Sequence, residues 1–76
     1  MSRNLLAQHR LNEFANWIEA RGIPVDRDPK GQYQKLGVRR LDGQWTYVYE
    51  QLDKTVHYTV DRRMEKLVRL FIEETK

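Results

Sequence analysis

Apolar side chains recur at three- and four-residue intervals in two segments of the chain. This spacing predicts a helix over residues 5–21 and a second helix over residues 61–75, because such intervals place apolar side chains on one helix face. The predicted stripe of the first helix consists of Ala7, Leu11, Phe14, Ala15 and Ile18, and that of the second consists of Met64, Leu67, Val68, Phe71 and Ile72.

The residues beside these segments support the two helices. Gly22 and Pro24 follow the first helix, where glycine favours a left-handed end and proline prevents continuation. Asp61 or Thr59 is expected to cap the second helix. Two prolines, a glycine and four charges within residues 23–32 predict a loop.

Between the helices, residues 33–60 predict three short strands rich in aromatic and β-branched side chains. Asp42-Gly43 is a hairpin signal, because a two-residue type I′ turn requires positive φ at both positions. A two-residue turn there places Val38 opposite Tyr47, and directly opposed residues share a face of the sheet.

A second tight turn at Asp53-Lys54 would complete a three-stranded antiparallel meander. One face would then be largely apolar, with Leu36, Val38, Trp45, Tyr47, Tyr49, Tyr58 and Val60, and the other largely polar, with Lys35, Gly37, Arg39, Thr46, Val48, Glu50, His57 and Thr59. We expect both helices to pack on the apolar face. The predicted architecture is therefore one α+β domain over residues 1–76, in the order αβββα.

The composition argues against enzyme chemistry. The 76 residues contain no cysteine, which excludes disulfides, thiolate zinc sites and cysteine nucleophiles. Ser2 is the one serine, so no rigidly held nucleophile is expected. His9 and His57 lie on separate predicted elements, and Asp26 and Asp28 suit a solvated turn better than a metal site. We therefore expect no catalytic residues, no metal and no cofactor.

The chain also lacks an apolar run of the ~20 residues needed to cross a membrane, and its first residues lack the apolar run of a secretory signal. We expect a cytoplasmic protein that does not associate with membranes.

The aromatic residues Trp45, Tyr47, Tyr49 and Tyr58 allow two interpretations. If they are exposed, they would form a platform on which single-stranded bases stack. The predicted register instead places them beneath the helices, and the core interpretation is favoured because the apolar face of a small sheet must be covered.

Basic residues form two groups, and the net charge of +3 favours an anionic partner. One group is on the first strand of the sheet and the other is on the last helix, and we expect them to face away from each other. A solvated surface is the alternative, since Glu65–Arg69 and Arg69–Glu73 are spaced for ion pairs within the helix. The candidate nucleic-acid-binding residues are Lys35, Arg39, Arg40, Arg62, Arg63, Lys66 and Arg69.

The first hairpin also carries a family resemblance. The segment Tyr33…Gly37-Val38-Arg39-Arg40…Gly43-Gln44-Trp45, followed by a third strand and an amphipathic helix, resembles the three-stranded-sheet DNA-binding domains. That group includes the AP2 domains of plant transcription factors and the arm-binding domains of phage-type integrases. The likeness covers residues 33–73 in element order and the first hairpin in residues. It implies that the open sheet face enters the major groove, with Arg39 outward and Trp45 in the core.

The order αβββα is also similar to that of double-stranded-RNA-binding domains. In those domains, basic residues near the start of the last helix hold phosphates, and Arg62, Arg63 and Lys66 lie there in this chain.

Together these patterns predict a small non-enzymatic domain that binds nucleic acid, with DNA favoured, through the sheet face or the last helix. The alternative is a protein-binding accessory or inhibitor protein of a phage-type mobile element, which acts by protein–protein contact. The near balance of charges, a free sheet edge and an exposed Val48 favour that alternative. One continuous positive face would indicate the first function, and an apolar patch with a polar rim the second.

Overall fold

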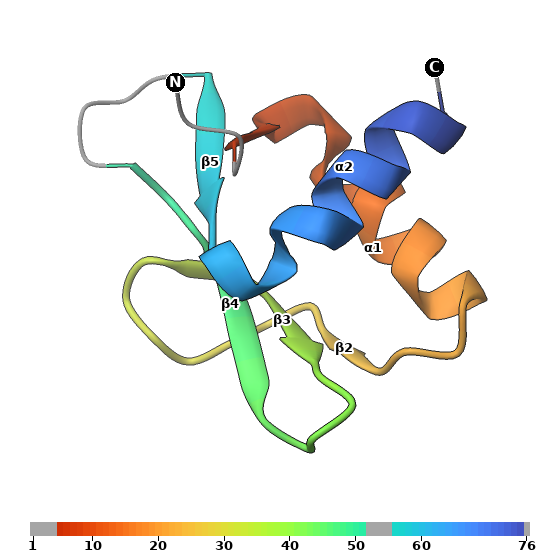
Figure 1. Cartoon of the computed structure of the whole chain (residues 1–76). Coiled ribbons are helices and arrows are strands. Elements are labelled where there is room, and N and C mark those ends of the chain that lie inside the picture. Colours follow the sequence, from red (N-terminus) through yellow and green to blue (C-terminus); the bar gives the residue numbers. More distant parts are fainter. Residues whose placement is uncertain (1–4, 52–55, 76) are drawn as a thin grey trace.

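Five strands form one antiparallel sheet in the order β1-β5-β4-β3-β2, and two helices lie together on one side of it (Figure 1). The computed structural model describes residues 5–51 and 56–75. The strands are β1 Leu5–Ala7, β2 Val25–Asp26, β3 Gln34–Arg39, β4 Trp45–Tyr49 and β5 His57–Val60. The helices are α1 Leu11–Ala20 and α2 Glu65–Glu74, and each follows a 3-10 turn, at Gln8–Arg10 and Arg62–Met64 respectively.

The predicted α+β class is confirmed, but the three-stranded meander is wrong because two short strands extend it. Leu5–Ala7 lie within the predicted first helix but instead pair with β5, so that Leu6 lies opposite Tyr58 and is buried. This pairing covers an edge of the meander that would otherwise be open. On the other side, Val25 within the predicted loop pairs with Val38 of β3.

The predicted end of the first helix and the predicted cap before the second are found where the sequence placed them, whereas α1 begins six residues later than expected. Gly22 follows α1 with a φ of 81°, in the left-handed region. Before α2, the Asp61 carboxylate accepts a hydrogen bond of 2.8 Å from the backbone N–H of Arg63. Asp61 is therefore the cap of the second helical segment.

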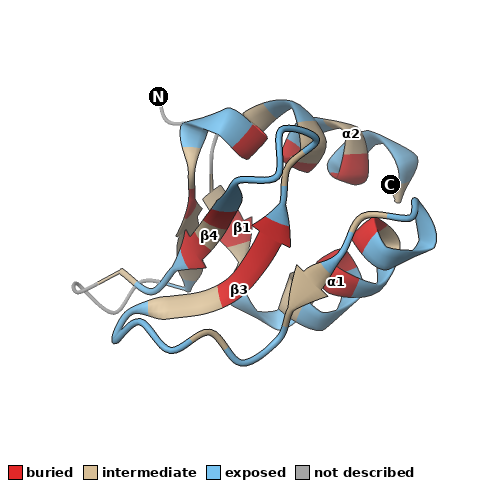
Figure 2. Cartoon of the chain, turned by 90° about the horizontal axis from the view of Figure 1, so that it is seen from below, coloured by how far each residue is buried: buried red, intermediate tan, exposed pale blue. Residues whose placement is uncertain are grey.

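The hydrophobic core lies between the helices and the sheet face that they cover, which we call the inner face. The rings of Phe14 from α1 and Phe71 from α2 meet edge to face, with centroids 5.1 Å apart. Figure 2 shows buried positions on β3, β4 and both helices. The buried apolar residues are Leu6, Phe14, Ala15, Ile18, Leu36, Val38, Val48, Val60, Met64, Val68 and Phe71, whereas Ile72 of the predicted stripe is exposed.

The hairpin between β3 and β4 has a three-residue loop, which corrects the predicted register. The N–H of Arg40 donates to the carbonyl of Gln44 at 2.7 Å, and the N–H of Gly43 donates to the carbonyl of Arg40 at 2.9 Å. Gly43 has a φ of 85°. This is a turn that is closed by one left-handed glycine, and it leaves one more residue in the loop than a type I′ turn.

The longer loop turns β4 over. Arg39 lies opposite Trp45 and Gly37 lies opposite Tyr47, one residue from the predicted pairing. A shift of one residue moves every side chain of a strand to the other face. Thr46 and Val48 therefore point into the core, where the Thr46 hydroxyl donates to the carbonyl of Val38 at 3.3 Å.

The pairing of β4 with β5 is also one residue from the prediction, because Val48 lies opposite Val60 and Tyr49 opposite Thr59. The predicted turn at Asp53-Lys54 lies outside the described residues. As a result β3 and β5 keep their predicted faces and β4 alone is reversed. The sheet face away from the helices, which we call the outer face, carries Asp26, Gly37, Arg39, Trp45, Tyr47, Tyr49 and Thr59.

Candidate nucleic-acid interface

Three aromatic side chains occupy alternate positions of β4 on the outer face, and we call Trp45, Tyr47 and Tyr49 the aromatic ladder. Trp45 is 40% exposed and Tyr49 is 36% exposed, while Tyr47 between them is half-buried. The ring centroids of Tyr47 and Tyr49 are 6.3 Å apart. The predicted core position of these residues is therefore wrong. Tyr58, the fourth member of the predicted aromatic group, faces inward and packs against the core.

Gly37 provides the surface on which two of these rings rest. A Cβ atom at Gly37 would lie 3.1 Å from Cε1 of Tyr47 and 3.3 Å from Cε3 of Trp45. The two rings therefore pack across the β3 backbone at the residue that lacks a side chain. Such contact between an aromatic side chain and a glycine on the neighbouring strand fixes the orientation of the ring.

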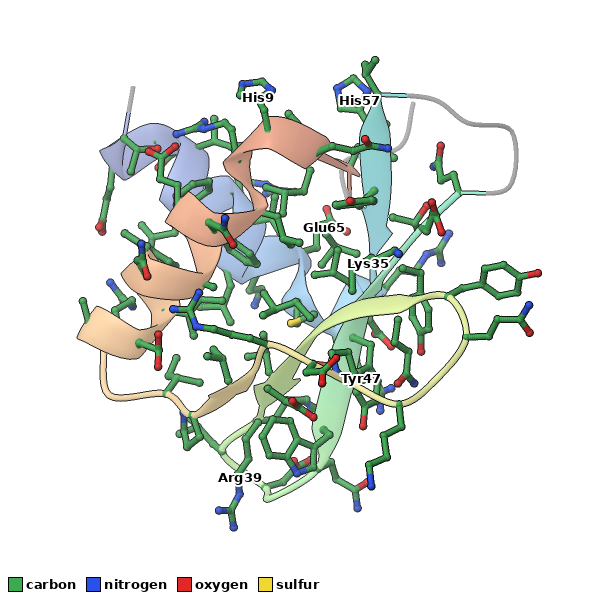
Figure 3. All side chains as sticks on the ribbon, turned by 180° about the vertical axis from the view of Figure 1, so that it is seen from behind. His9, Lys35, Arg39, Tyr47, His57 and Glu65 are labelled. Carbon is green, nitrogen blue, oxygen red and sulfur yellow. The ribbon has the colours of Figure 1, made fainter. Side chains whose placement is uncertain are left out.

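Basic residues lie at both ends of the aromatic ladder. Arg39 is opposite Trp45 and exposed, and it makes no ion pair among residues 5–51 and 56–75. Lys35 lies at the irregularity in β3, and its ammonium group is 3.4 Å from the carboxylate of Glu50. In Figure 3, Arg39 extends from the sheet away from the body of the domain.

A groove beside the hairpin brings together arginines from three parts of the sequence, and we call it the arginine groove. Arg21 follows α1, Arg39 and Arg40 are at the end of β3, and Arg63 is in the turn before α2. The groove encloses about 480 Å³. Its remaining lining residues are Ile23, Val38, Leu41, Asp42, Met64 and Leu67.

Three of these arginines have carboxylate partners. Arg40 lies 3.4 Å from Asp42, Arg63 lies 2.9 Å from Asp61, and Arg21 lies 3.7 Å from Glu74. The hydrogen bond from Arg63 holds the pKa of Asp61 below its ordinary value, although partial burial opposes the shift. The arginines of these pairs remain in contact with solvent. Ion pairs of this kind contribute about 0–1 kcal/mol, so an incoming phosphate competes readily with them.

The seven predicted basic residues thus separate into three sets. The arginine groove brings together Arg39, Arg40 and Arg63. The expectation that the strand group and the helix group face away from each other is therefore wrong for Arg63. Lys35 stands at the other end of the ladder. The other three lie outside the groove lining: Arg62 and Lys66 are exposed, and Arg69 pairs with Glu65 at 2.7 Å, as the helical spacing predicted.

Sequence reasoning missed two parts of this site. Arg21 stands outside both basic groups of the sequence, and the fold alone brings it to the hairpin. The residues of the aromatic ladder are the second part, because the predicted register places them in the core. The signal for the ladder was present in Gly43, which suits a three-residue loop as well as a two-residue one.

The acidic residues of the loop after α1 have a structural role. The Asp26 carboxylate accepts a hydrogen bond of 3.0 Å from the N–H of Asp28, which is the turn that the sequence suggested. Within residues 5–51 and 56–75, no three His, Asp or Glu side chains are grouped to hold a metal ion. In the same residues, no helix has the length and apolar character needed to span a bilayer.

Comparison with known proteins finds no matching family model, no similar curated protein and no similar solved structure. The resemblance to three-stranded-sheet DNA-binding domains therefore stays a prediction. The core position that it implied for Trp45 is wrong, because this side chain is on the outer face.

Proposed function

We propose that this domain binds single-stranded nucleic acid on the outer face of its sheet. The observation that carries the proposal is the aromatic ladder, which is partly exposed, held by the backbone at Gly37 and flanked by Arg39. Aromatic side chains beside basic residues on a sheet are the combination with which proteins hold unpaired bases and their phosphates.

The geometry suits a strand of separate bases. Alternate residues of a strand are about 6.6–6.8 Å apart, and the Tyr47 and Tyr49 centroids have a similar separation of 6.3 Å. Each ring can therefore receive one base without sharing it. In a duplex the base faces are already stacked on one another, so the ladder favours a single strand.

The same geometry argues against the major-groove contact that the family resemblance implies. Reading base edges in a duplex needs hydrogen-bonding side chains on the face that enters the groove. On β4 the outward positions instead carry one indole and two phenols, whose largest surface is the ring face. Stacking on bases uses that surface directly.

Trp45 provides a direct reporter, because the chain has only two tryptophans. In a Trp17→Phe variant all tryptophan emission comes from Trp45. We expect titration with oligothymidylate or oligouridylate at ~50 mM salt to quench this emission, and binding to weaken at ~200 mM salt. A duplex of the same length should quench it far less. An unchanged emission with every single strand at low salt would refute the proposal.

Substitutions locate the site. Each base stacked on an aromatic side chain is worth about 1–3 kcal/mol, so Trp45→Ala should weaken binding by about 5- to 150-fold. Arg39→Ala should also weaken binding, because it removes the cation that flanks the ladder. Lys66→Ala is its matched control, since Lys66 is an exposed cation on α2. If Lys66→Ala and Arg69→Ala weaken binding while Trp45→Ala does not, the last helix is the site and the aromatic ladder is not.

A protein partner is a second candidate function, favoured by Leu41. This side chain at the hairpin tip is 106% exposed, so its burial by a partner would remove a large apolar surface from water. The exposed Val48 that the sequence suggested in favour of this alternative is instead buried. The two functions differ in salt dependence: no binding to any strand at low salt would favour the protein partner.

A further inference from the structure

We infer that the arginine groove holds the stretch of the same single strand that leaves the aromatic ladder beyond Trp45, binding a phosphodiester group and one nucleotide. This inference rests on the proposed function and adds a second site to it. It identifies the ligand as a strand long enough to extend past the sheet.

Arg39 joins the two surfaces. Its side chain is opposite Trp45 on the outer face, and the same residue lines the arginine groove. A strand that stacks on Trp45 and then turns across the end of β3 passes Arg39, beyond which the groove is lined by residues from the helix side of the sheet. The next arginine in the chain, Arg40, lines the groove as well.

The charge of the groove suits a phosphodiester. Four arginines line it. Three of them pair with carboxylates at the surface, and of these carboxylates only that of Asp42 also lines the groove. Guanidinium groups bind phosphate oxygens in pairs through parallel N–H donors, and they are less strongly hydrated than ammonium groups. Because Arg39 makes no ion pair in the described part of the chain, it is available to the first phosphate.

The groove also has an apolar part that a free phosphate would not use. Its lining includes the half-buried Ile23 and Leu67, and Leu41 extends into solvent beside it. Its volume of about 480 Å³ is within the range of ~300–1,000 Å³ that is typical for sites of small organic ligands, the size class of a nucleotide. A base can pack on these side chains while its phosphate contacts the arginines.

Oligomer length tests this inference. We would measure the affinity for thymidylate oligomers of increasing length, with the unsubstituted chain and an Arg40→Ala/Arg63→Ala variant. Oligomers just long enough to cover the aromatic ladder should bind both proteins equally. Longer oligomers should bind the unsubstituted chain more tightly, and the double variant should lose that gain. For long oligomers, the slope of log affinity against log salt concentration should become shallower by about 0.7, the change for one lost phosphate contact on a single strand.

Two further variants make the test specific. Asp42→Asn removes the carboxylate from the groove but keeps an oxygen that can accept the hydrogen bond from the N–H of Gln44. It should tighten binding of long oligomers by about 3- to 5-fold, the order expected for one charge interaction near water. Arg69→Ala is the control, because Arg69 is outside the groove lining.

The outcomes separate this inference from the proposed function. If Trp45→Ala weakens all lengths and the groove variants weaken none, the groove is not a site and the proposed function stands. If the groove variants weaken short and long oligomers equally, or Arg69→Ala has the same effect, a general charge effect replaces the inference. If the groove variants weaken binding of long oligomers and Trp45→Ala changes nothing, the aromatic ladder is not a binding site and the groove alone binds phosphate. Binding of an acidic peptide but of no oligomer would overturn both.

Discussion

Val48→Ala tests the register of β4, on which the aromatic ladder depends. Val48 is fully buried and lies opposite both Leu36 and Val60 on the inner face. The substitution removes the equivalent of two buried methylene groups, worth about 0.8 kcal/mol each. The cavity that remains beneath the helices adds on the order of 1 kcal/mol. We expect the free energy of unfolding to fall by about 2–3 kcal/mol.

Tyr49→Ala provides the comparison, because it removes a larger side chain one position away. Tyr49 is on the outer face and 36% exposed, so its loss removes the partial burial of its ring and its contact with Tyr47, but it opens no cavity in the core. These terms amount to about 1–2 kcal/mol. Truncation of the smaller residue, Val48, should therefore lower the free energy of unfolding more than truncation of the larger residue, Tyr49.

Urea unfolding followed by far-UV circular dichroism measures both variants, with the slope of the transition checked for equality. The register of a two-residue turn places Tyr49 in the core and therefore predicts the reverse order of stabilities. Truncation of Tyr49 would then lower the free energy of unfolding by about 3–5 kcal/mol. A Tyr49→Ala variant less stable than Val48→Ala would therefore refute the register and remove the aromatic ladder from the outer face.

Further predictions concern the turn, the cap and the buried hydroxyl. Gly43→Ala should cost about 1–2 kcal/mol in urea unfolding, because Gly43 has a φ of 85°, whereas Lys30→Ala in the preceding loop should cost nothing measurable. Asp61→Ala should cost about 0.5–2 kcal/mol at pH 7 by loss of the cap. Because the folded pKa of Asp61 is below its ordinary 3.8, its contribution is present above that pH and lost as the pH falls through the folded pKa. Thermal unfolding across pH 2–6 should therefore show a smaller acid-side loss for Asp61→Ala, and an identical loss would contradict this. Thr46→Val should change stability by less than about 1 kcal/mol, since the hydroxyl makes one long hydrogen bond of 3.3 Å.

The sequence allowed the helices, the three central strands and their order to be predicted, because these depend on local periodicity. Phe14, Ile18, Val68 and Phe71 are buried as their helical spacing required. The two outer strands could not be predicted in this way. β2 has two residues and β1 three, and such short segments are strands only because a neighbour pairs with them.

The face of β4 could not be decided from its own residues. In the segment Trp45–Tyr49, both alternating sets can be buried: one is aromatic, and the other consists of the β-branched Thr46 and Val48. The choice depends on the loop at Gly43, where one additional residue reverses the strand. The small β-branched set fits the inner face, since Phe14 and Phe71 of the helices already fill the core there.

The candidate site depends on the same choice and on tertiary proximity. Arg39 and Arg40 were identified from the hairpin, but their convergence with Arg21 and Arg63 results from the position of α1 and α2 beside it. No periodicity in the sequence relates residues so far apart.

The most direct test of the central claim follows the two indole N–H resonances of the unsubstituted, ¹⁵N-labelled protein during titration with a short single strand. Trp45 is on the outer face, whereas Trp17 is on the helical side, where its Nε1 donates to Glu74 at 3.0 Å. We predict that the Trp45 resonance shifts progressively and that the Trp17 resonance does not move. A strand that binds and shifts Trp17, or the amides of α2, while the Trp45 resonance stays in place would contradict a single-strand site on the outer face.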